Sequence, residues 1–497
     1  MINEVIVTKI NSTYVRIDAY EDVLHDINSY FAVYAEGYIF NPRYKARVWD
    51  GRIRFFGINN RLLSSGLVPL LEKFCEKHSY TLKYESDFNN FESEFDEQEF
   101  KETCDEALKD SGLHLRDYQE EACKLALQKR TGILQCCTSS GKSMIIYCMI
   151  KNMLKYKRIH KILLIVPNVS LVEQMRSDFI EYGWKDVDDT VELLYSSKKP
   201  TFKLPVLIST WQSLQKIEDK EYYEEIDAVI VDECHGSKAN VINTILKQCI
   251  NTEYRIGTTG TLPTGPADLL YINAVLGNVL YTITSKELID RGILTRMTVA
   301  GIFVKYPAQF IAKNKGRSYP EEVKLVESYV ARQKVLATIL AHTPKEHNVL
   351  LLCNHIEHLS NTAAWLTANY PDRNVKVISG KVSAADREDI RKKLESEEGT
   401  IIVATYGTCS TGINMPKLHE VILYANSKSK IKVLQSLGRG LRKHNTKNRV
   451  ILYDIIDDMS YTARTRVIHN YLYQHWKERE KYYKEQEFPI KTMELGV

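Results

Sequence analysis

The ten cysteines of this 497-residue chain include no Cys-x-x-Cys pair, so the sequence contains neither a zinc framework nor a redox motif. We expect all ten to be reduced, as is usual in the cytoplasm. No apolar run approaches the roughly 18 residues of a membrane-spanning helix, and the N-terminus lacks a signal-peptide pattern. The sequence therefore predicts a soluble cytoplasmic protein that has no membrane partner.

A large excess of charge of one sign is also missing. The 67 lysines and arginines against 63 aspartates and glutamates leave a formal net charge of +4, which is too small for a generally basic protein. Any binding to nucleic acid must therefore depend on local patches. The length predicts about three or four domains, and the hydrophobic content of 44% is enough for large packed cores.

Short apolar runs alternate with helical patterns in two long stretches of the chain. The first stretch contains runs at 132–135, 162–166, 206–208, 228–231 and 255–257, and the second at 349–352, 375–378, 401–403, 421–423 and 450–453. Such alternation is typical of doubly wound α/β domains, in which helices cover both faces of a parallel sheet. We therefore predict two such domains in tandem, at residues 111–295 and 296–458.

The flanking segments differ in composition from these two domains. Residues 1–84 mix strand-like and helical stretches and predict a small α+β domain. The segment from Glu85 to Glu106 carries ten acids and one lysine, which predicts a linker or a solvated helix over 85–110. In the tail, 459–497, helical spacing places six residues on one face of a docking helix: Val467, Ile468, Tyr471, Leu472, His475 and Trp476.

The segment Cys137–Ser143 directly follows the first apolar run and matches the end of a phosphate-binding loop. In such loops backbone N–H groups and a helix N-terminus face the phosphates. Lys142 then reaches the β- and γ-phosphates, and the Ser143 hydroxyl binds Mg²⁺. Cys136 replaces the usual first glycine, so a chance Gly-Lys-Ser turn is the alternative. The loop residues expected to bind nucleotide are Thr138, Ser139, Ser140, Gly141, Lys142 and Ser143.

Two adjacent carboxylates, Asp232 and Glu233, follow the apolar run 228–231. In open α/β sheets the carboxyl ends of the strands are where ligands bind. There Asp232 can hold Mg²⁺ and Glu233 can orient a water molecule for attack on a phosphate. With the phosphate loop, this pair predicts a motor driven by a nucleotide.

The motifs along the chain, taken in order over about 330 residues, resemble those of superfamily 2 helicases and translocases. This resemblance implies two RecA-like motor domains that use ATP and Mg²⁺. It assigns adenine reading to Arg116 and Gln119, and a further nucleotide contact to Gly412. It implies nucleic-acid contacts at six residues of the motor domains: Pro167, Asn168, Thr210, Trp211, Thr405 and Thr411.

The same resemblance links hydrolysis to movement through His235, Thr259, Thr261 and Gln435. Near the end of the second domain, Arg439 and Arg442 lie three residues apart and hence on one face of a helix. Planar guanidinium groups suit phosphate oxygens, so these arginines are expected to reach ATP when the cleft closes, as arginine fingers do. The late acidic residues Asp454, Asp457 and Asp458 are expected to mark a strand end and a helix cap.

A basic and aromatic patch lies in the N-terminal domain. From Tyr38 to Arg61, six basic residues interleave with six aromatics, and Asp50 is the only acid. Basic groups neutralise phosphates and aromatic rings stack on bases, so the patch indicates either a DNA surface or the packing of a small domain. The residues expected to contact DNA are Arg43, Lys45, Arg47, Trp49 and Arg52.

The segments Gly37–Tyr44 and Trp49–Ile53 resemble the phage UvsW-type DNA helicases. That resemblance implies ATP-dependent remodelling of branched DNA (fork regression, branch migration, R-loop or D-loop unwinding and annealing) in recombination, replication and repair. It also implies the host-cell cytoplasm, with phage recombination or single-strand-binding proteins as partners. Three alternatives stay open: an RNA helicase, the motor subunit of a restriction system, and a catalytically inactive nucleic-acid clamp.

Overall fold

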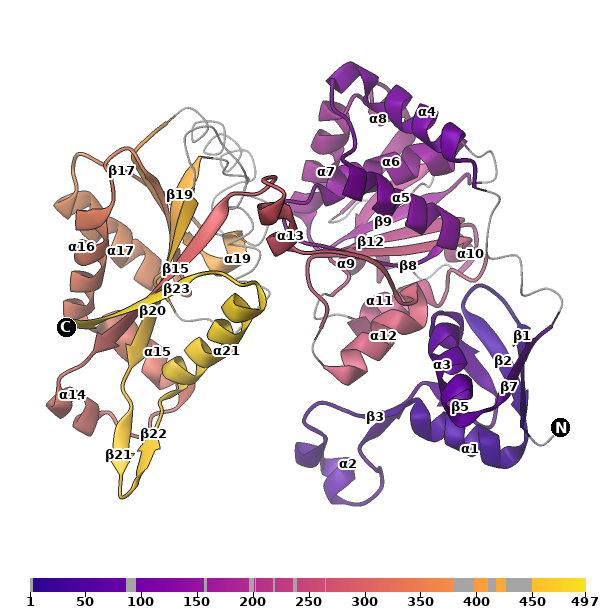
Figure 1. The fold of residues 1–497 in the computed structure, drawn as a ribbon, viewed down its shortest axis with the longest axis horizontal. Coiled ribbons are helices and arrows are strands. Elements are labelled where there is room, and N and C mark those ends of the chain that lie inside the picture. Colours follow the sequence, from indigo (N-terminus) through magenta and orange to yellow (C-terminus); the bar gives the residue numbers. More distant parts are fainter. Residues whose placement is uncertain are drawn as a thin grey trace. The chain divides into compact units, whose positions relative to one another are not determined.

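The computed structural model describes residues 3–85, 95–155, 159–195, 201, 203–217, 220–235, 239–263, 265–379, 397–409, 417–425 and 449–497. The chain folds into two compact units, Met1–Ile283 and Thr284–Val497 (Figure 1). The division falls about a dozen residues before the expected boundary at 295/296.

A small α+β domain begins the first unit. Its five-stranded sheet has the order β5-β6-β2-β1-β7. Alternate residues Val5, Val7, Val15 and Ile17 are fully buried against two helices, because successive side chains of a strand point to opposite faces. The elements are β1 (Glu4–Lys9), β2 (Tyr14–Ala19), α1 (Glu21–Tyr30), β5 (Phe56–Gly57), β6 (Leu62–Ser64), a 3₁₀ turn η2 (Ser65–Leu67), α3 (Val68–His78) and β7 (Thr81–Tyr84).

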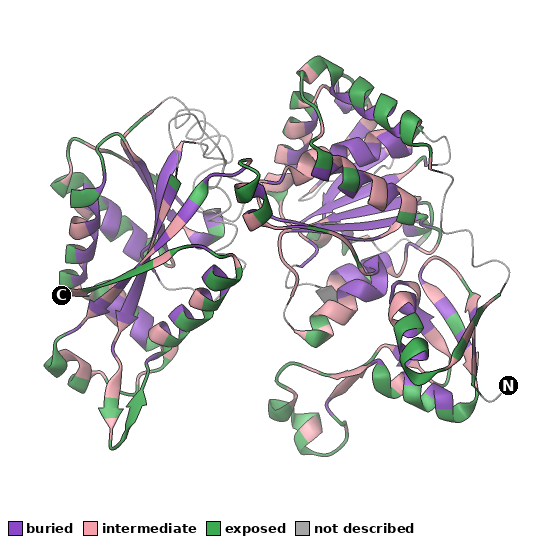
Figure 2. Ribbon diagram, in the orientation of Figure 1, coloured by how far each residue is buried: buried purple, intermediate pink, exposed green. Residues whose placement is uncertain are grey.

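An excursion from this domain, which we call the arm (residues 32–54), leaves the sheet between α1 and β5 (Figure 1). Its base is a two-stranded ladder of β3 (Ala32–Tyr34) and β4 (Arg52–Arg54). Between them lie a 3₁₀ turn (Tyr38–Phe40) and a short helix α2 (Pro42–Lys45), whose first turn is capped by Asn41. Most of the arm is exposed (Figure 2).

The rest of the first unit is a doubly wound domain whose seven-stranded sheet has the order β10-β11-β9-β12-β13-β8-β14. Every pair in it is parallel. Its strands are β8 (Thr131–Cys136), β9 (Ile162–Val166), β10 (Val191–Leu194), β11 (Val206–Thr210), β12 (Ala228–Asp232), β13 (Tyr254–Thr259) and β14 (Val279–Ile283). Its helices are α5 (Asp117–Lys129), α6 (Lys142–Lys155), α7 (Val169–Glu181), α8 (Val187–Thr190), α9 (Trp211–Leu214), α10 (Lys220–Glu224), α11 (Ala239–Leu246) and α12 (Pro266–Leu276).

The acidic segment expected to be a linker or a solvated helix contains α4 (Glu97–Leu108), which packs on the first doubly wound domain. Phe100, Cys104 and Leu108 recur every four residues and are buried, while the acids occupy the opposite face. Asp96 caps the helix by accepting hydrogen bonds from the N–H groups of Gln98 and Glu99. The acidic composition of the segment did not reveal this apolar face, because composition carries no information about the spacing of apolar residues along a helix.

The small domain docks on the adjoining doubly wound domain through a close, partly polar interface. The buried Arg255 of β13 donates to Thr13 Oγ1 at 2.8 Å, and Ser12 Oγ donates to the Ile250 carbonyl at 2.6 Å. A Cβ on Gly66 would lie 2.1 Å from the Asn273 carbonyl oxygen, so only glycine fits where η2 meets α12. Ala274 of α12 belongs to the core of the small domain.

The second unit is also built on a seven-stranded parallel sheet, with the order β17-β18-β16-β19-β20-β15-β23. Its strands are β15 (Arg296–Lys305), β16 (Asn348–Cys353), β17 (Asn374–Ile378), β18 (Thr400–Thr405), β19 (Leu418–Leu423), β20 (Arg449–Asp458) and β23 (Ile490–Gly496). Its helices are α13 (Ser285–Asp290), α14 (Ala308–Lys313), α15 (Tyr319–Ser328), α16 (Gln333–His342), α17 (Ile356–Asn369), α19 (Tyr406–Cys409) and α21 (Tyr471–Glu485). The two doubly wound domains confirm the predicted fold class.

The tail is more varied than the predicted docking helix. A hairpin of β21 (Tyr461–Ala463) and β22 (Arg466–Ile468) precedes α21, and β23 then joins the edge of the sheet. Val467 and Ile468 are therefore exposed strand residues, and their placement on the helix was wrong. Leu472, His475 and Trp476 do lie on the buried face of α21.

The late aspartates have structural roles, but only part of the expectation holds: Asp458 ends β20, whereas Asp454 and Asp457 lie within that strand, and the expected helix cap was wrong, because Asn470 caps α21. Asp457 accepts two hydrogen bonds from the buried Arg332, and Asp454 accepts two from Arg479 of α21. The nine cysteines whose side chains the structure describes are all buried and free. Across the described residues, no helix is both long and apolar enough to cross a membrane.

Candidate nucleotide site and nucleic-acid contacts

The expected site residues of the first doubly wound domain gather at one edge of its sheet. Lys142 follows β8, Asp232 ends β12 and Thr259 ends β13. Pro167 follows β9 and Thr210 ends β11. Because all these strands are parallel, their carboxyl ends lie at the same edge, which is the position of ligand sites in this class of fold.

The loop between β8 and α6 has the backbone shape of a phosphate cradle. Ser139 (φ 67°) and Gly141 (φ 86°) are both left-handed, a conformation that favours glycine. Ser139 thus adopts this conformation although it carries a side chain. A Cβ on Gly141 would lie 2.3 Å from Gln119 Nε2, so this glycine also permits a close approach.

Gln119 ties this loop to the start of α5. Its Nε2 donates to the Ser140 carbonyl at 2.9 Å, and its Oε1 accepts the Arg116 backbone N–H at 2.9 Å. Tyr118, which the sequence analysis did not single out, donates to the same Ser140 carbonyl at 2.7 Å. In this conformation one N–H of the Gln119 amide and the second lone pair of its oxygen remain for a purine edge.

Lys142 and Glu233 form the ionic centre of the site. Lys142 Nζ lies 3.5 Å from Glu233 Oε1 and donates to the Cys136 carbonyl at 3.2 Å. Burial opposes the charge on Lys142, but Glu233 and Asp232 together raise its pKa. Burial also opposes the charge on Glu233, but Lys142 and His235 lower its pKa to about 2. The pair is therefore charged over the whole physiological pH range.

Asp232 is the carboxylate of the site whose negative charge its surroundings disfavour. Burial and the neighbouring Glu233 carboxylate raise its pKa to about 6. Its Oδ1 accepts hydrogen bonds from Thr258 Oγ1 at 2.7 Å and from the Glu233 N–H at 3.0 Å, which fix the carboxylate plane. Thr258 was missed by sequence reasoning, although its position at the carboxyl end of β13 was a usable signal.

Glu233 itself has a positive φ of 51°, which is unfavourable for a residue with a side chain. This turn brings its carboxylate between Lys142 and the His235 ring, whose Nδ1 lies 3.2 Å from Glu233 Oε2. Strained backbone of this kind persists only where the surroundings hold it, and it is concentrated at functional sites.

A short hydrogen-bonded chain leads from Glu233 to the end of β13. Thr259 Oγ1 donates its proton to the Thr261 carbonyl at 2.7 Å. It must therefore accept from His235 Nδ1, 2.6 Å away, so that this nitrogen carries a proton. A Cβ on Gly260 would lie 3.5 Å from Thr138 Oγ1, so the loop after β13 also borders the phosphate loop.

The residues expected to hold Mg²⁺ have suitable chemistry. Ser143 offers a hydroxyl, hydrogen-bonded to Tyr182 Oη at 2.8 Å, and Asp232 offers a carboxylate. Mg²⁺ prefers such hard oxygen donors and commonly keeps water or phosphate oxygens in its other positions. Within the described residues there is no cluster of three or more His, Cys, Asp or Glu side chains that suits a metal.

The expected nucleic-acid residues of the motor domains include two helix caps. Asn168 accepts the Leu171 N–H and caps α7, and Thr210 accepts the Ser213 N–H and caps α9. Their strands, β9 and β11, are adjacent and parallel, so Pro167, Asn168, Thr210 and the half-buried Trp211 follow neighbouring strand ends. In the second unit, Thr405 ends β18 and its hydroxyl is bonded to that of Thr408. These contacts give Asn168, Thr210 and Thr405 a local structural role.

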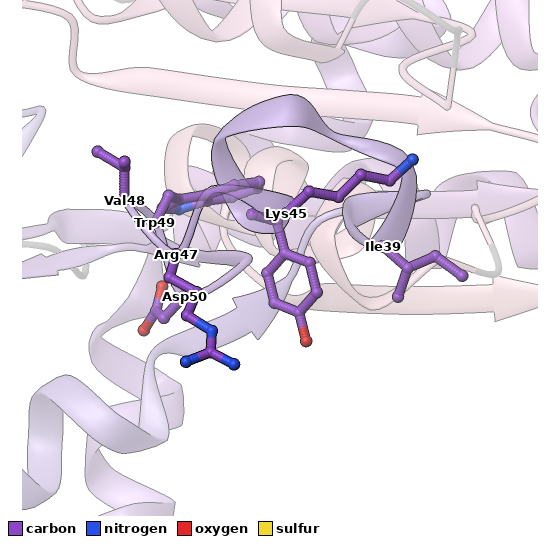
Figure 3. A pocket seen from close by; sticks show the side chains of 7 residues that line it. Ile39, Lys45, Arg47, Val48, Trp49 and Asp50 are labelled. Atoms are coloured by element: carbon purple, nitrogen blue, oxygen red, sulfur yellow. The ribbon is translucent and has the colours of Figure 1, made fainter.

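The arm presents most of the predicted patch to solvent. Arg43, Lys45 and Arg47 are exposed, and Arg52 lies over the Tyr34 ring at 4.9 Å. Trp49 is half-buried, with its indole N–H donating to the Arg52 carbonyl at 2.9 Å. A pocket of about 500 Å³ opens beside it, with Ile39, Lys45, Arg47, Val48, Trp49 and Asp50 around it (Figure 3).

Not all aromatics of the patch are exposed. Phe56 is buried in the core of the small domain, and Phe55 packs against Tyr271 of α12. The packing alternative therefore applies to Phe55 and Phe56, and the DNA-surface alternative stays open for the exposed members of the arm. Gln435, Arg439, Arg442, Thr411 and Gly412 lie outside the described residues.

The fold and the site place the chain in a class. Residues 112–264 match the family model of the type III restriction enzyme res subunit, and residues 331–444 match the helicase conserved C-terminal domain. An HsdR-type fragment of a type I restriction enzyme from Vibrio vulnificus YJ016 has the same fold, with a TM-score of 0.57 at 18% identity over 90% of this chain and 78% of that one. The chain is a superfamily 2 helicase with two RecA-like motor domains.

The small domain identifies the family within this class. Residues 5–85 match the model of the N-terminal domain of the DNA helicase UvsW. The ATP-dependent DNA helicase uvsW of Enterobacteria phage T4 is 33% identical over 503 residues, which cover 97% of this chain and 98% of that protein. The crystal structure of T4 UvsW matches with a TM-score of 0.51 at 30% identity, over 99% of each chain. The chain therefore belongs to the UvsW family of ATP-dependent DNA helicases.

Proposed function

We propose that this protein uses ATP and Mg²⁺ to remodel branched DNA, such as forks, four-way junctions and displaced-strand loops, during recombination, replication and repair. The carrying observation is the chain of contacts that runs from Lys142 through Glu233 and His235 to Thr259 and Thr261. It joins the phosphate loop to the loop after β13. Any change at the phosphates is thereby communicated to another element of the same motor domain.

In the proposed mechanism, the incoming phosphates draw the Lys142 ammonium away from the Cys136 carbonyl and from Glu233. Glu233 is already ionised because its pKa is about 2, so it accepts a hydrogen bond from the attacking water as soon as the lysine leaves. Ser143 and Asp232 would hold Mg²⁺, which would neutralise part of the phosphate charge when bound. The family motifs give Arg439 and Arg442 the role of arginine fingers, and give Gln435 and Gly412 roles in coupling and in nucleotide binding.

Movement of Glu233 also changes the surroundings of His235, because Glu233 Oε2 and Thr259 Oγ1 both lie within 3.2 Å of the same ring nitrogen. When Glu233 turns towards the attacking water, the Nδ1–H of His235 donates to Thr259 Oγ1 alone. The geometry of the loop at 259–261 then follows the state of the nucleotide. This loop is the proposed link between hydrolysis and the movement of DNA.

The arm supports the choice of DNA as substrate. Its exposed cations suit phosphates, and its pocket beside Trp49 suits a base or a junction edge. The docking of the small domain through Arg255 and Gly66 makes it one body with the first motor domain. A branch held by the arm is thus held at a set position relative to the nucleotide site.

The decisive experiment measures ATP turnover with single-stranded DNA, duplex, fork, four-way junction and RNA. We expect forks and junctions to stimulate turnover the most. Glu233→Gln, which retains the shape of the side chain and loses its charge, is the matched inactive control and should bind ATP without hydrolysing it. Equal or greater stimulation by RNA would favour the RNA-helicase alternative, because the 2′-hydroxyl is what distinguishes the two substrates.

A further inference from the structure

The second unit carries a basic surface that none of the helicase motifs includes. Two segments, residues 306–320 and 459–477, contain six lysines and arginines and no aspartate or glutamate. Acids border both segments, at Glu321, Asp458 and Glu478, and we call the two acid-free segments together the basic hairpin surface.

The sheet topology explains why the two segments lie together. β15 and β20 are parallel neighbours that pair along their whole length, from Arg296 with Arg449 to Lys305 with Asp458. Both strands therefore end at the same edge, and each runs directly into one of the two segments. Lys315 lies over the Tyr461 ring at 5.0 Å, and Tyr319 packs against Tyr471 and His475. The hairpin β21–β22 projects from this edge (Figure 1).

The cations of this surface are available to a ligand. In the part of the chain that the structure describes, Lys313, Lys315, Arg464 and Arg466 form no ion pair with a carboxylate, and all four are exposed. Unpaired cations on one surface repel one another, and this repulsion destabilises the folded protein. A bound polyanion removes the repulsion.

The acids closest to this surface are engaged elsewhere. Asp457 is buried against Arg332 and Tyr306, and Asp458 accepts a hydrogen bond from Lys305. Glu322 is buried and accepts a hydrogen bond from the Leu472 N–H, and Glu321 accepts one from the Ser318 N–H. They therefore do not neutralise the hairpin arginines.

The hairpin tip gives a second, independent indication. Ala463 pairs with Arg466, so Arg464 and Thr465 form the turn, and Arg464 has a left-handed φ of 55°. Two-residue hairpin turns of this kind favour glycine, asparagine or aspartate at such positions. A residue with a Cβ is disfavoured in this conformation, so the arginine is present against the local preference. The neighbouring Val467 and Tyr471 are 59% and 46% exposed and offer apolar contact beside the charges.

We propose that the basic hairpin surface binds a single-stranded segment of the DNA substrate, through phosphates at Arg464 and Arg466 and through bases against Tyr471 and Val467. Cations beside exposed aromatic rings are the combination that single strands require. This inference rests on the proposed DNA-helicase function and adds to it a strand contact on the second unit, separate from the arm.

The test is the salt dependence of binding of a fluorescent single-stranded oligonucleotide to the full-length protein. Arg464→Gln with Arg466→Gln should lower the log–log slope by about 1.4, since each lost contact with a single strand contributes about 0.7. Lys345→Gln with Arg449→Gln is the matched control, because it removes the same charge from exposed residues at the amino end of the same sheet. The control should retain the wild-type slope.

Arg464→Lys with Arg466→Lys should also retain the slope, because it keeps the charge. If the lysine variant loses as much as the glutamine variant, or if the control loses as much, the surface does not act as a phosphate site. Thermal unfolding temperatures identify any variant that fails to fold. If the turnover of the wild-type protein does not respond to DNA at all, the proposed function fails; if it responds while the glutamine variant keeps its slope, only this inference is overturned.

Discussion

The nucleotide site of the first unit and the basic hairpin surface of the second both concentrate charge, in opposite ways. Lys142 lies 3.5 Å from Glu233, which in turn neighbours His235, and each of these groups is largely withdrawn from water. Arg464 and Arg466 instead project into solvent without an acidic partner among the described residues. Charges in the first region depend on one another, whereas those in the second act separately. Single substitutions should therefore have large, coupled effects in the first and small, additive effects in the second.

The largest effect is expected from Lys142→Ala. The change removes the ammonium group that lies 3.5 Å from Glu233 and that is expected to reach the transferring phosphate. Turnover should fall by at least about 10²-fold, while DNA binding is largely retained. Steady-state hydrolysis and DNA titrations measure the two properties. Lys101→Ala, at a half-exposed position on α4, is the control, and normal turnover by Lys142→Ala would remove the assignment of the loop.

The second-largest effect is expected from the chain of contacts that runs from Glu233 through His235 and Thr259 to Thr261. Thr259→Val retains the shape of the side chain but removes the hydroxyl that joins His235 to the Thr261 carbonyl. We expect unwinding per ATP hydrolysed to fall several-fold, with a smaller change in turnover itself. Thr261→Val is a matched control, because only the backbone of Thr261 takes part in the chain. Equal losses from both substitutions would show that the hydroxyl of Thr259 is not the link.

Asp232→Asn should separate stability from activity. Because the pKa of Asp232 is raised from 3.8 to about 6, the group is ionised in the folded protein above pH 6, and this buried charge lowers stability relative to the unfolded chain. Removing the charge should abolish turnover but stabilise the ligand-free protein by at most about 3 kcal/mol at pH 7.5, at about 1.4 kcal/mol per pKa unit. The gain should decline as the pH falls through 6 and disappear below about 4. Urea unfolding at several pH values tests this; a gain that persists at pH 3.5 would contradict it.

The smallest effects are expected in the arm, whose exposed cations resemble those of the hairpin. Replacing Arg43 and Arg47 by Gln should lower the salt slope for duplex-containing junctions by about 1.8, at about 0.9 per contact. Trp49→Phe keeps an aromatic ring but removes the indole hydrogen bond to the Arg52 carbonyl. The variant therefore distinguishes stacking of the ring on a DNA base from stabilisation of the arm by this hydrogen bond. If both changes lower the unfolding temperature while the slope stays constant, the arm is a packing element.

Much of the motor fold followed from local pattern. All ten apolar runs identified in the sequence are strands of the two parallel sheets, because strands buried on both faces are continuous apolar runs. The four remaining strands of these sheets were missed: β10, β14, β15 and β23. Three of them lie at sheet edges, where one side of the strand is uncovered and polar residues interrupt the run. β15 alternates buried and less buried residues, so it too lacks a continuous run.

The order of the motifs, read from the sequence alone, determined the class of motor. It also placed Asp232 and Glu233 at a strand end and Lys142 in the loop after a strand, because the run 228–231 ends directly before Asp232 and the run 132–135 precedes the phosphate loop. Only the tertiary structure decided their partners. The bonds of Gln119 to Ser140, of Asp232 to Thr258 and of His235 to Thr259 join elements that are distant in the chain. The same holds for the basic hairpin surface, since 306–320 and 459–477 meet only because β15 and β20 pair. Local periodicity reports burial, but pairing between distant strands determines which side chains meet.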